Sequence, residues 1–102
     1  MADAVVEDRQ ELAALRASVR AFAEREVMPG AAARDRSGEY PAALVRRLGE
    51  LDLMGVSVPG ADGGLGMSTR AQLVAIEEVA RADAALASIH TAHYLGLSLI
   101  HI

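Results

Sequence analysis

The chain has 102 residues, a formal net charge of −4 and 52% hydrophobic residues, but only two tyrosines and one phenylalanine. Its length fits one small domain or part of one, and a core built from alanine, leucine, valine and isoleucine is typical of helix bundles. The basic residues are all arginines and form no run, which argues against nucleic-acid or anionic-membrane partners, and the absence of cysteine excludes a disulfide framework, a thiol nucleophile and a cysteine-ligated metal.

The N-terminal segment, residues 1–8, has early acidic side chains and lacks the apolar stretch of a secretory signal. It also differs from an arginine-rich transit peptide. No apolar run along the chain approaches the ~20 residues that a membrane span needs. We therefore expect a soluble, cytoplasmic protein with no membrane span.

A first helix is predicted to follow Asp8, a candidate N-cap with Glu11 at the capping-box spacing. Its apolar stripe contains Leu12, Leu15, Val19, Phe22, Ala23 and Val27. The opposite, polar face contains Arg16, Arg20, Glu24 and Arg25. Pro29-Gly30 is expected to end the helix, and residues 31–39 to form a polar connection.

A second helix is predicted to open at Tyr40-Pro41, where the missing N–H of proline costs nothing. Its apolar face contains Leu44, Val45, Leu48 and Leu51. After a short apolar stretch comes Val58–Ser68, VPGADGGLGMS, with one proline and four glycines. Such a segment indicates sharp turns or a close backbone approach.

The glycine-rich segment also raises the alternative of a phosphate cradle. A P-loop needs a lysine, which this chain lacks, and a dinucleotide fingerprint needs three glycines directly after a strand. Here helical sequence precedes Gly64-x-Gly66. A structural turn between two helices is therefore the favoured interpretation.

Ser68 or Thr69 is predicted to cap a third helix, Thr69 having Gln72 at the capping-box spacing. This helix is expected to expose Glu77 four residues before Arg81. The side chains it is expected to bury are Leu73, Ile76, Val79 and Ala80. Asp83 is a candidate N-cap for a fourth helix that starts at an angle to the third. No segment alternates like a strand, so the predicted class is all-α.

Several different short motifs follow one another in a characteristic order over residues 12–96. In chain order they are Arg20-x-Phe22-Ala23-x-x-x-Val27-x-Pro29, Asp35, Tyr40-Pro41-x-x-Leu44-Val45-x-x-Leu48-Gly49-Glu50-Leu51, Leu53-Met54-Gly55-Val56-x-Val58-Pro59, Gly63-Gly64-Leu65-Gly66-x-Ser68 and Glu77-Glu78-Val79-Ala80-Arg81-x-Asp83. Together they resemble the N-terminal helical domain of the acyl-CoA dehydrogenases. The resemblance implies an up-and-down, bundle-like helical domain over residues 1–96, incomplete, without the middle β-domain and the C-terminal helical domain.

The resemblance also implies a function for the parent protein. Members of the family are FAD-dependent enzymes that convert an acyl-CoA thioester into a trans-2-enoyl-CoA, pass the electrons to an electron-transfer flavoprotein and commonly form homotetramers. Their catalytic glutamate and most of their flavin contacts lie in the two later domains. We therefore expect no catalytic, cofactor-binding or metal-binding residue in this chain, and no activity of the fragment alone.

In the family, the helix after the Arg-x-Asp motif helps to wall the acyl-chain pocket. On this sequence that helix is Ala84–Gly96. The four pocket candidates, at i, i+3, i+4 and i+7 on one face, are Ser88, Thr91, Ala92 and Leu95. Ordinary close helix packing is the alternative for each of them.

Two pairs of polar residues suggest other chemistry. Glu77 and Glu78 point about 100° apart on a helix, so a solvated, salt-bridged face is favoured over a catalytic pair. His90 and His93 lack a nearby carboxylate or cysteine that would complete a zinc site, and His101 lies in the tail. Partly buried, hydrogen-bonded histidines near the pocket are expected instead.

The tail, Leu97–Ile102, reads LSLIHI. This string matches the usual translation of a transposon-end adapter used in sequencing libraries, which favours a processing scar over an ordinary apolar helix end. The chain is then a truncated fragment of its parent. The alternative is a free-standing helical module that binds a partner or an acyl-CoA without redox activity.

Overall fold

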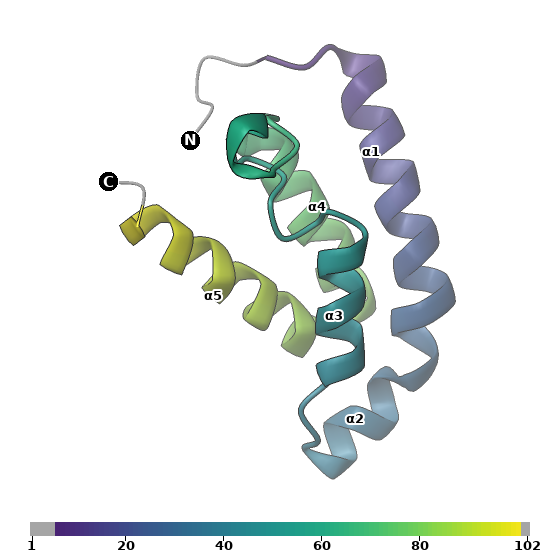
Figure 1. The fold of residues 1–102 in the computed structure, drawn as a ribbon. Helices are drawn as coiled ribbons and strands as arrows, with labels where there is room; N and C mark the ends of the chain where they lie inside the picture. The colour runs from purple at the N-terminus through teal and green to yellow at the C-terminus, as the bar shows by residue number, and fades with distance from the viewer. Residues whose placement is uncertain (1–5, 101–102) are drawn as a thin grey trace.

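The computed structural model describes residues 6–100, with side chains through Leu97. Over these residues the predicted all-α class is confirmed (Figure 1). The α-helices are α1 (Arg9–Phe22), α2 (Ala31–Ser37), α3 (Ala42–Glu50), α4 (Thr69–Ala82) and α5 (Ala84–Ile100). Helix α5 thus includes the first part of the suspected adapter tail, and Leu97 packs partly buried against the core. Residues 101 and 102, including His101, lie outside the described residues, so the adapter origin stays a prediction.

The predicted N-caps are present at three helix starts. The Asp8 carboxylate accepts from the backbone N–H of Glu11 at 2.7 Å, and the Ser68 hydroxyl accepts from that of Ala71 at 3.1 Å. At the start of α5, Asp83 Oδ1 accepts from the backbone N–H of Ala85 at 3.0 Å. Each cap satisfies donors that would otherwise lack a partner in the first helical turn.

The connection between α1 and α3 differs from the prediction. The helical winding does not stop at Pro29-Gly30. A π-type segment (Ala23–Val27) and a 3₁₀ turn (Met28–Gly30) follow α1 and lead directly into α2. Helix α2 occupies most of the expected polar connection. Three consecutive alanines favour it, and Gly38, at φ 67°, ends it in the left-handed conformation. The sequence predicted only a polar connection over residues 31–39 and did not predict α2.

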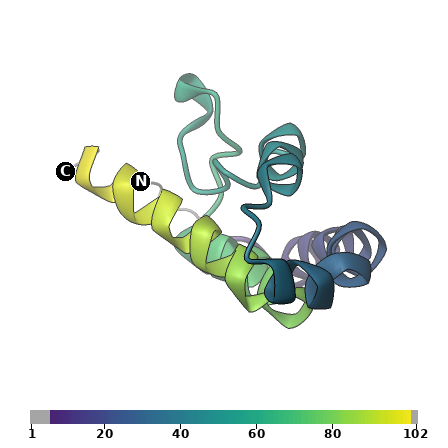
Figure 2. The same ribbon diagram turned by 90° about the horizontal axis from the view of Figure 1, so that it is seen from below.

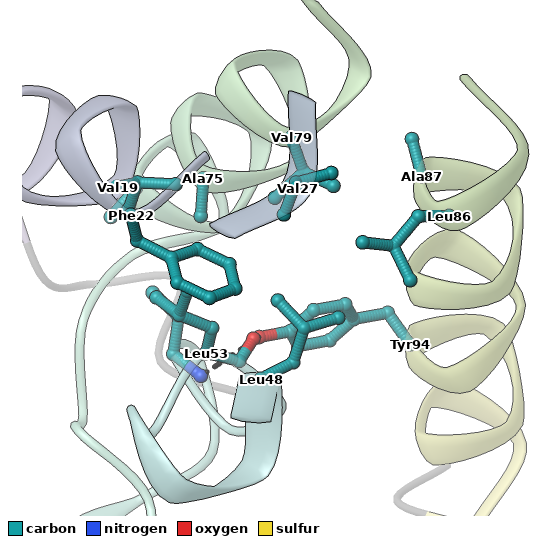
Figure 3. Close-up of a cluster of buried hydrophobic side chains, with 12 residues drawn as sticks. Val19, Phe22, Val27, Leu48, Leu53, Ala75, Val79, Leu86, Ala87 and Tyr94 are labelled. Carbon is teal, nitrogen blue, oxygen red and sulfur yellow. Dashed lines mark hydrogen bonds between the residues drawn. The ribbon is translucent and has the colours of Figure 1, made fainter. Parts of the chain in front are cut away.

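The helices form two layers. Helix α4 packs between α1 and α5, while α3 packs on α5. Seen from below, α3 and the glycine-rich segment lie on one side of the layer formed by α1, α4 and α5 (Figure 2). The buried core between the layers contains Val19, Phe22, Val27, Leu48, Leu53, Val56, Ala71, Ala75, Val79, Leu86, Ala87 and Tyr94 (Figure 3).

Helix α4 buries a different face from the one predicted. Leu73 is 58% exposed and Ala80 is also exposed, whereas Val79 is fully buried as expected and Ile76 is partly buried. The buried positions include Ala71 and Ala75, whose small side chains lie in the core shared with α1. The periodicity was ambiguous because apolar residues occur around most of α4, so packing decided the face.

Candidate functional site

Helix α5 carries the predicted pocket residues and starts from an anchored end. Besides capping α5, Asp83 accepts hydrogen bonds from Arg34 of α2, at 2.8 Å from Nη2 and 3.1 Å from Nε. Burial raises the pKa of Asp83, but the hydrogen bonds from Arg34 and from the backbone outweigh it and leave the pKa below the ordinary value. The carboxylate therefore stays ionised and fixes where α5 leaves α4.

The four predicted pocket residues share one face of α5, and that face is exposed. Ser88, Thr91, Ala92 and Leu95 all lie outside the core, with Leu95 67% exposed. The Ser88 hydroxyl donates to the Ala84 carbonyl at 3.1 Å, and the Thr91 hydroxyl donates to that of Ala87 at 2.8 Å. Because both hydroxyls bond to the helix's own backbone, the face presents mainly methyl and methylene groups.

The opposite face of α5 holds the chain segment that follows α3. His90, fully buried, lies 2.7 Å through Nε2 from the Leu53 carbonyl oxygen, and the Tyr94 hydroxyl donates to the same oxygen. The Tyr94 oxygen in turn accepts from the backbone N–H of Val56 at 2.9 Å. Burial lowers the pKa of His90 and raises that of Tyr94 to about 12, so both rings are neutral at pH 7.

His93 is the exposed member of this group. Its Nε2 lies 2.8 Å from the Met54 carbonyl oxygen. The two predicted histidines are therefore hydrogen-bonded to backbone, one deeply buried and one exposed. Among the described residues, no three histidine, aspartate or glutamate side chains form a group that could hold a metal ion.

The backbone of the glycine-rich segment packs closely against its own residues. Gly63 and Gly66 adopt φ values of 87° and 66°, which favour glycine. A Cβ at Gly64 would lie 2.1 Å from the Val58 carbonyl oxygen, so only glycine fits this backbone approach. The segment is therefore a tightly packed turn.

A surface hollow of about 320 Å³ lies beside this turn. It is lined by Gly49, Asp52, Met54, Gly55, Val58, Asp62, Gly63, Gly64, His93 and Leu97. Two carboxylates and no arginine face it, whereas the pyrophosphate of a flavin dinucleotide needs cationic or N–H donors. The residues around this hollow therefore do not fit FAD.

A charged cluster between α1 and α4 was missed by the sequence reasoning. Glu78, whose side chain is fully buried, accepts from Arg20 Nε at 2.9 Å and also bonds to Arg16. The hydrogen bond from Arg20 is the main cause that lowers the pKa of Glu78. Glu77, 54% exposed, matches the solvated face that was predicted, but Glu78 does not, and Arg16 and Arg20 face α4. The i, i+4 spacing of these arginines was the available signal.

None of the helices over residues 6–100 combines the length and apolar content that crossing a bilayer requires.

Comparisons with known proteins give the family. The family model for the acyl-CoA dehydrogenase N-terminal domain matches residues 9–102. An acyl-CoA dehydrogenase of Bacillus subtilis (strain 168) is 36% identical over 84 residues, which cover 82% of this chain and 22% of that protein. The mitochondrial short-chain specific acyl-CoA dehydrogenases of Bos taurus and Mus musculus are each 40% identical over 85 residues, which cover 80% of this chain and 21% of each relative. The chain spans about a fifth of the length of these relatives, and it belongs to the acyl-CoA dehydrogenase family through the N-terminal helical domain.

Proposed function

We propose that this chain is the N-terminal part of an FAD-dependent acyl-CoA dehydrogenase that oxidises an acyl-CoA thioester to a trans-2-enoyl-CoA. The observation that carries the proposal is the family match over residues 9–102. The resemblance to the family implies that the catalytic glutamate and most of the flavin contacts lie in later domains, beyond the fifth of the relatives' length that this chain matches. The chain on its own is therefore inactive and does not retain FAD.

The contribution of this domain is a wall for the acyl chain. The exposed face formed by Ser88, Thr91, Ala92 and Leu95 supports this role, because its hydroxyls are bonded to the helix backbone and its surface is apolar. An acyl chain needs such a surface and gains nothing from free hydroxyls. Most of the residues that select the acyl length lie outside the chain.

The partners of the parent follow from the same proposal. They are an acyl-CoA substrate, an electron-transfer flavoprotein and further copies of the subunit in a homotetramer. The cytoplasmic location is also part of the proposal. Relatives differ in this respect: the short-chain enzymes of Bos taurus and Mus musculus are named as mitochondrial, whereas the Bacillus subtilis relative comes from a bacterium.

A chimera tests the function. Residues 1–96 replace the matching segment of the Bacillus subtilis relative, and the purified chimera is assayed for bound FAD and for flavin bleaching on addition of acyl-CoA. We expect both. A chimera that folds and binds FAD but never reacts with any acyl-CoA would contradict the proposal, and acyl-CoA binding by the isolated chain would favour a free-standing module.

The pocket role has its own test in the same chimera. Ala92→Trp fills the exposed face of α5, whereas Ala14→Trp places the same bulk on an exposed position of α1. We expect Ala92→Trp to raise KM for longer acyl chains about tenfold or more, which corresponds to the loss of a few buried methylene contacts. Ala14→Trp leaves KM unchanged. Equal effects of the two variants would exclude the pocket assignment.

A further inference from the structure

The segment between α3 and α4 behaves as one hydrogen-bonded unit. Its two arms are joined by backbone bonds from Leu65 N–H to Gly55 O at 3.0 Å, from Gly66 N–H to Val58 O at 2.8 Å and from Met67 N–H to Val56 O at 2.9 Å. We call residues 53–67 the glycine loop. Because these bonds join residues 55–58 to residues 65–67, contacts that fix the first segment also fix the second.

Helix α5 holds this loop through three side chains, which we call the α5 clamp: His90, His93 and Tyr94. They bond to the backbone of residues 53–56. The bonds from His90 and Tyr94 are buried, and both go to the carbonyl of Leu53. That carbonyl is therefore the main point at which the loop is attached to α5.

His90 has an unusual protonation requirement in this clamp. A carbonyl oxygen only accepts, so His90 Nε2 carries the hydrogen and Nδ1 is bare in the neutral ring. Nδ1 is buried and has no hydrogen-bond partner among the described residues. A second proton on the ring would create a buried N–H without an acceptor and a buried positive charge.

The surroundings do not compensate that charge. The electrostatic effect of the neighbouring His93 on the same helix also disfavours protonation of His90. The ring of Tyr94 lies 5.3 Å away and is neutral. On the facing loop, residues 53–56 carry no ionisable side chain, and on α4 the buried carboxylate of Glu78 is already paired with arginines of α1.

We propose that His90 is a proton-operated latch, and that its protonation releases the glycine loop from α5 while α1 and α4 stay packed together. The Glu78 cluster on the α1–α4 side consists of ionised groups that keep their charge at mildly acidic pH. The clamp, by contrast, depends on a neutral imidazole. Mild acid therefore acts on one interface and spares the other.

The pH window follows from the sign of the shift. Burial lowers the folded-state pKa of His90 below its ordinary 6.5. Closing the loop then excludes a proton that the open form binds, so the closed state is fully stable above pH 6.5 and weakens as the pH falls below it. The carboxylates with shifted pKa values lie outside this window, because the pKa of Glu78 is below its ordinary 4.5 and that of Asp83 is below its ordinary 3.8.

Amide hydrogen exchange on the full chain tests the latch. After division by the intrinsic rate, we expect the opening constant of the Val56, Leu65 and Met67 amides to rise by up to about tenfold per pH unit from pH 6.5 to about pH 5. Amides in the middle of α1 and α4 should show no such rise. A flat loop profile, or an equal rise in α1 and α4, would overturn the proposal.

Matched variants assign the effect to one ring. His90→Gln keeps an N–H that can donate to the Leu53 carbonyl but cannot titrate, so its loop profile should be flat, whereas His93→Gln should keep the wild-type rise. A pH-dependent loop in His90→Gln would refute the latch. Should that variant not fold, NMR titration of the wild-type His90 ring decides: the loop amides must follow its protonation curve, and loop amides that ignore it overturn the proposal.

Discussion

The α1–α4 interface and the α5 clamp both bury polar side chains, but they satisfy them by different chemistry. Between α1 and α4, the carboxylate of Glu78 is paired with guanidinium groups of Arg16 and Arg20. In the clamp, the neutral rings of His90 and Tyr94 bond to a backbone carbonyl. The first interface tolerates mild acid because its charges are mutually stabilised, and the second does not because it has no counter-charge.

The comparison also separates a scaffold from a movable part. The α1–α4 interface joins two helices of similar length along their sides, whereas the clamp holds a loop rich in glycine at a few atoms. Variants that affect one interface at a time can break or sharpen this distinction.

The largest effect on the free energy of unfolding is expected from Gly64→Ala, which changes the packing of the glycine loop alone. An added Cβ would lie 2.1 Å from the Val58 carbonyl oxygen and 2.5 Å from the Val58 Cβ, both too close to relieve without moving backbone. We expect a loss of more than about 3 kcal/mol in the free energy of unfolding, measured by urea denaturation. Gly60→Ala, where nothing lies within 4 Å of the new Cβ, should change it by less than about 0.5 kcal/mol. Similar losses in both variants would show that loop packing is not the cause.

Glu78→Gln removes the charge at the centre of the α1–α4 interface and keeps the side-chain shape. We expect a loss of about 2 kcal/mol in the free energy of unfolding, since charge-assisted hydrogen bonds to two arginines are weakened. The exposed control, Glu77→Gln, should lose less than about 0.5 kcal/mol. Comparable urea-denaturation midpoints for Glu78→Gln and Glu77→Gln would contradict a special role for the buried carboxylate.

Glu78 is also expected to contribute to the loss of stability at acidic pH, which we call the acid limb. The folded-state pKa of Glu78 is lowered, chiefly by the hydrogen bond from Arg20, so its contribution is present above the ordinary pKa of 4.5 and is lost as the pH falls through the lowered value. Thermal unfolding of the wild type at a series of pH values should therefore show a decline below pH 4.5 that Glu78→Gln reduces. An unchanged acid limb in the variant would assign the decline to other carboxylates.

Tyr94→Phe weakens the clamp without adding a charge or a titratable group. The change removes the hydroxyl that bonds to the Leu53 carbonyl and the Val56 N–H. We expect a loss of about 1 to 1.5 kcal/mol and faster exchange of the Val56 amide, with the α4 amides unaffected. The control is Tyr40→Phe at a 62% exposed position, where no change is expected. Uniform loss of protection throughout the chain would argue against a local clamp.

The smallest effect is expected on the exposed face of α5. Leu95→Ala should change the free energy of unfolding by less than about 0.5 kcal/mol, because the side chain is 67% exposed. On the buried face of the same helix, Leu86→Ala should cost about 2 to 5 kcal/mol. A large loss for Leu95→Ala in calorimetry of the isolated chain would mean that this face packs on the domain itself.

The candidate site was predictable only in its local geometry. Helical spacing places Ser88, Thr91, Ala92 and Leu95 on one face, and the structure has them there. That this face is exposed depends on Leu86, His90 and Tyr94 turning the other side of α5 into the core. Spacing alone cannot rank two faces of a helix that is apolar nearly all round.

The sequence by itself determined the starts of α1, α4 and α5, because the caps at Asp8, Ser68 and Asp83 bond to groups within three residues. It also determined the turns at Gly63 and Gly66, whose positive φ values favour glycine. Tertiary structure decided which face of α4 is buried, that the ion-paired Glu78 is buried rather than solvated, and that His90 bonds to the loop. These contacts join residues 37 to 62 positions apart in the chain. Such contacts form only when the helices pack, so a local pattern carries little information about them.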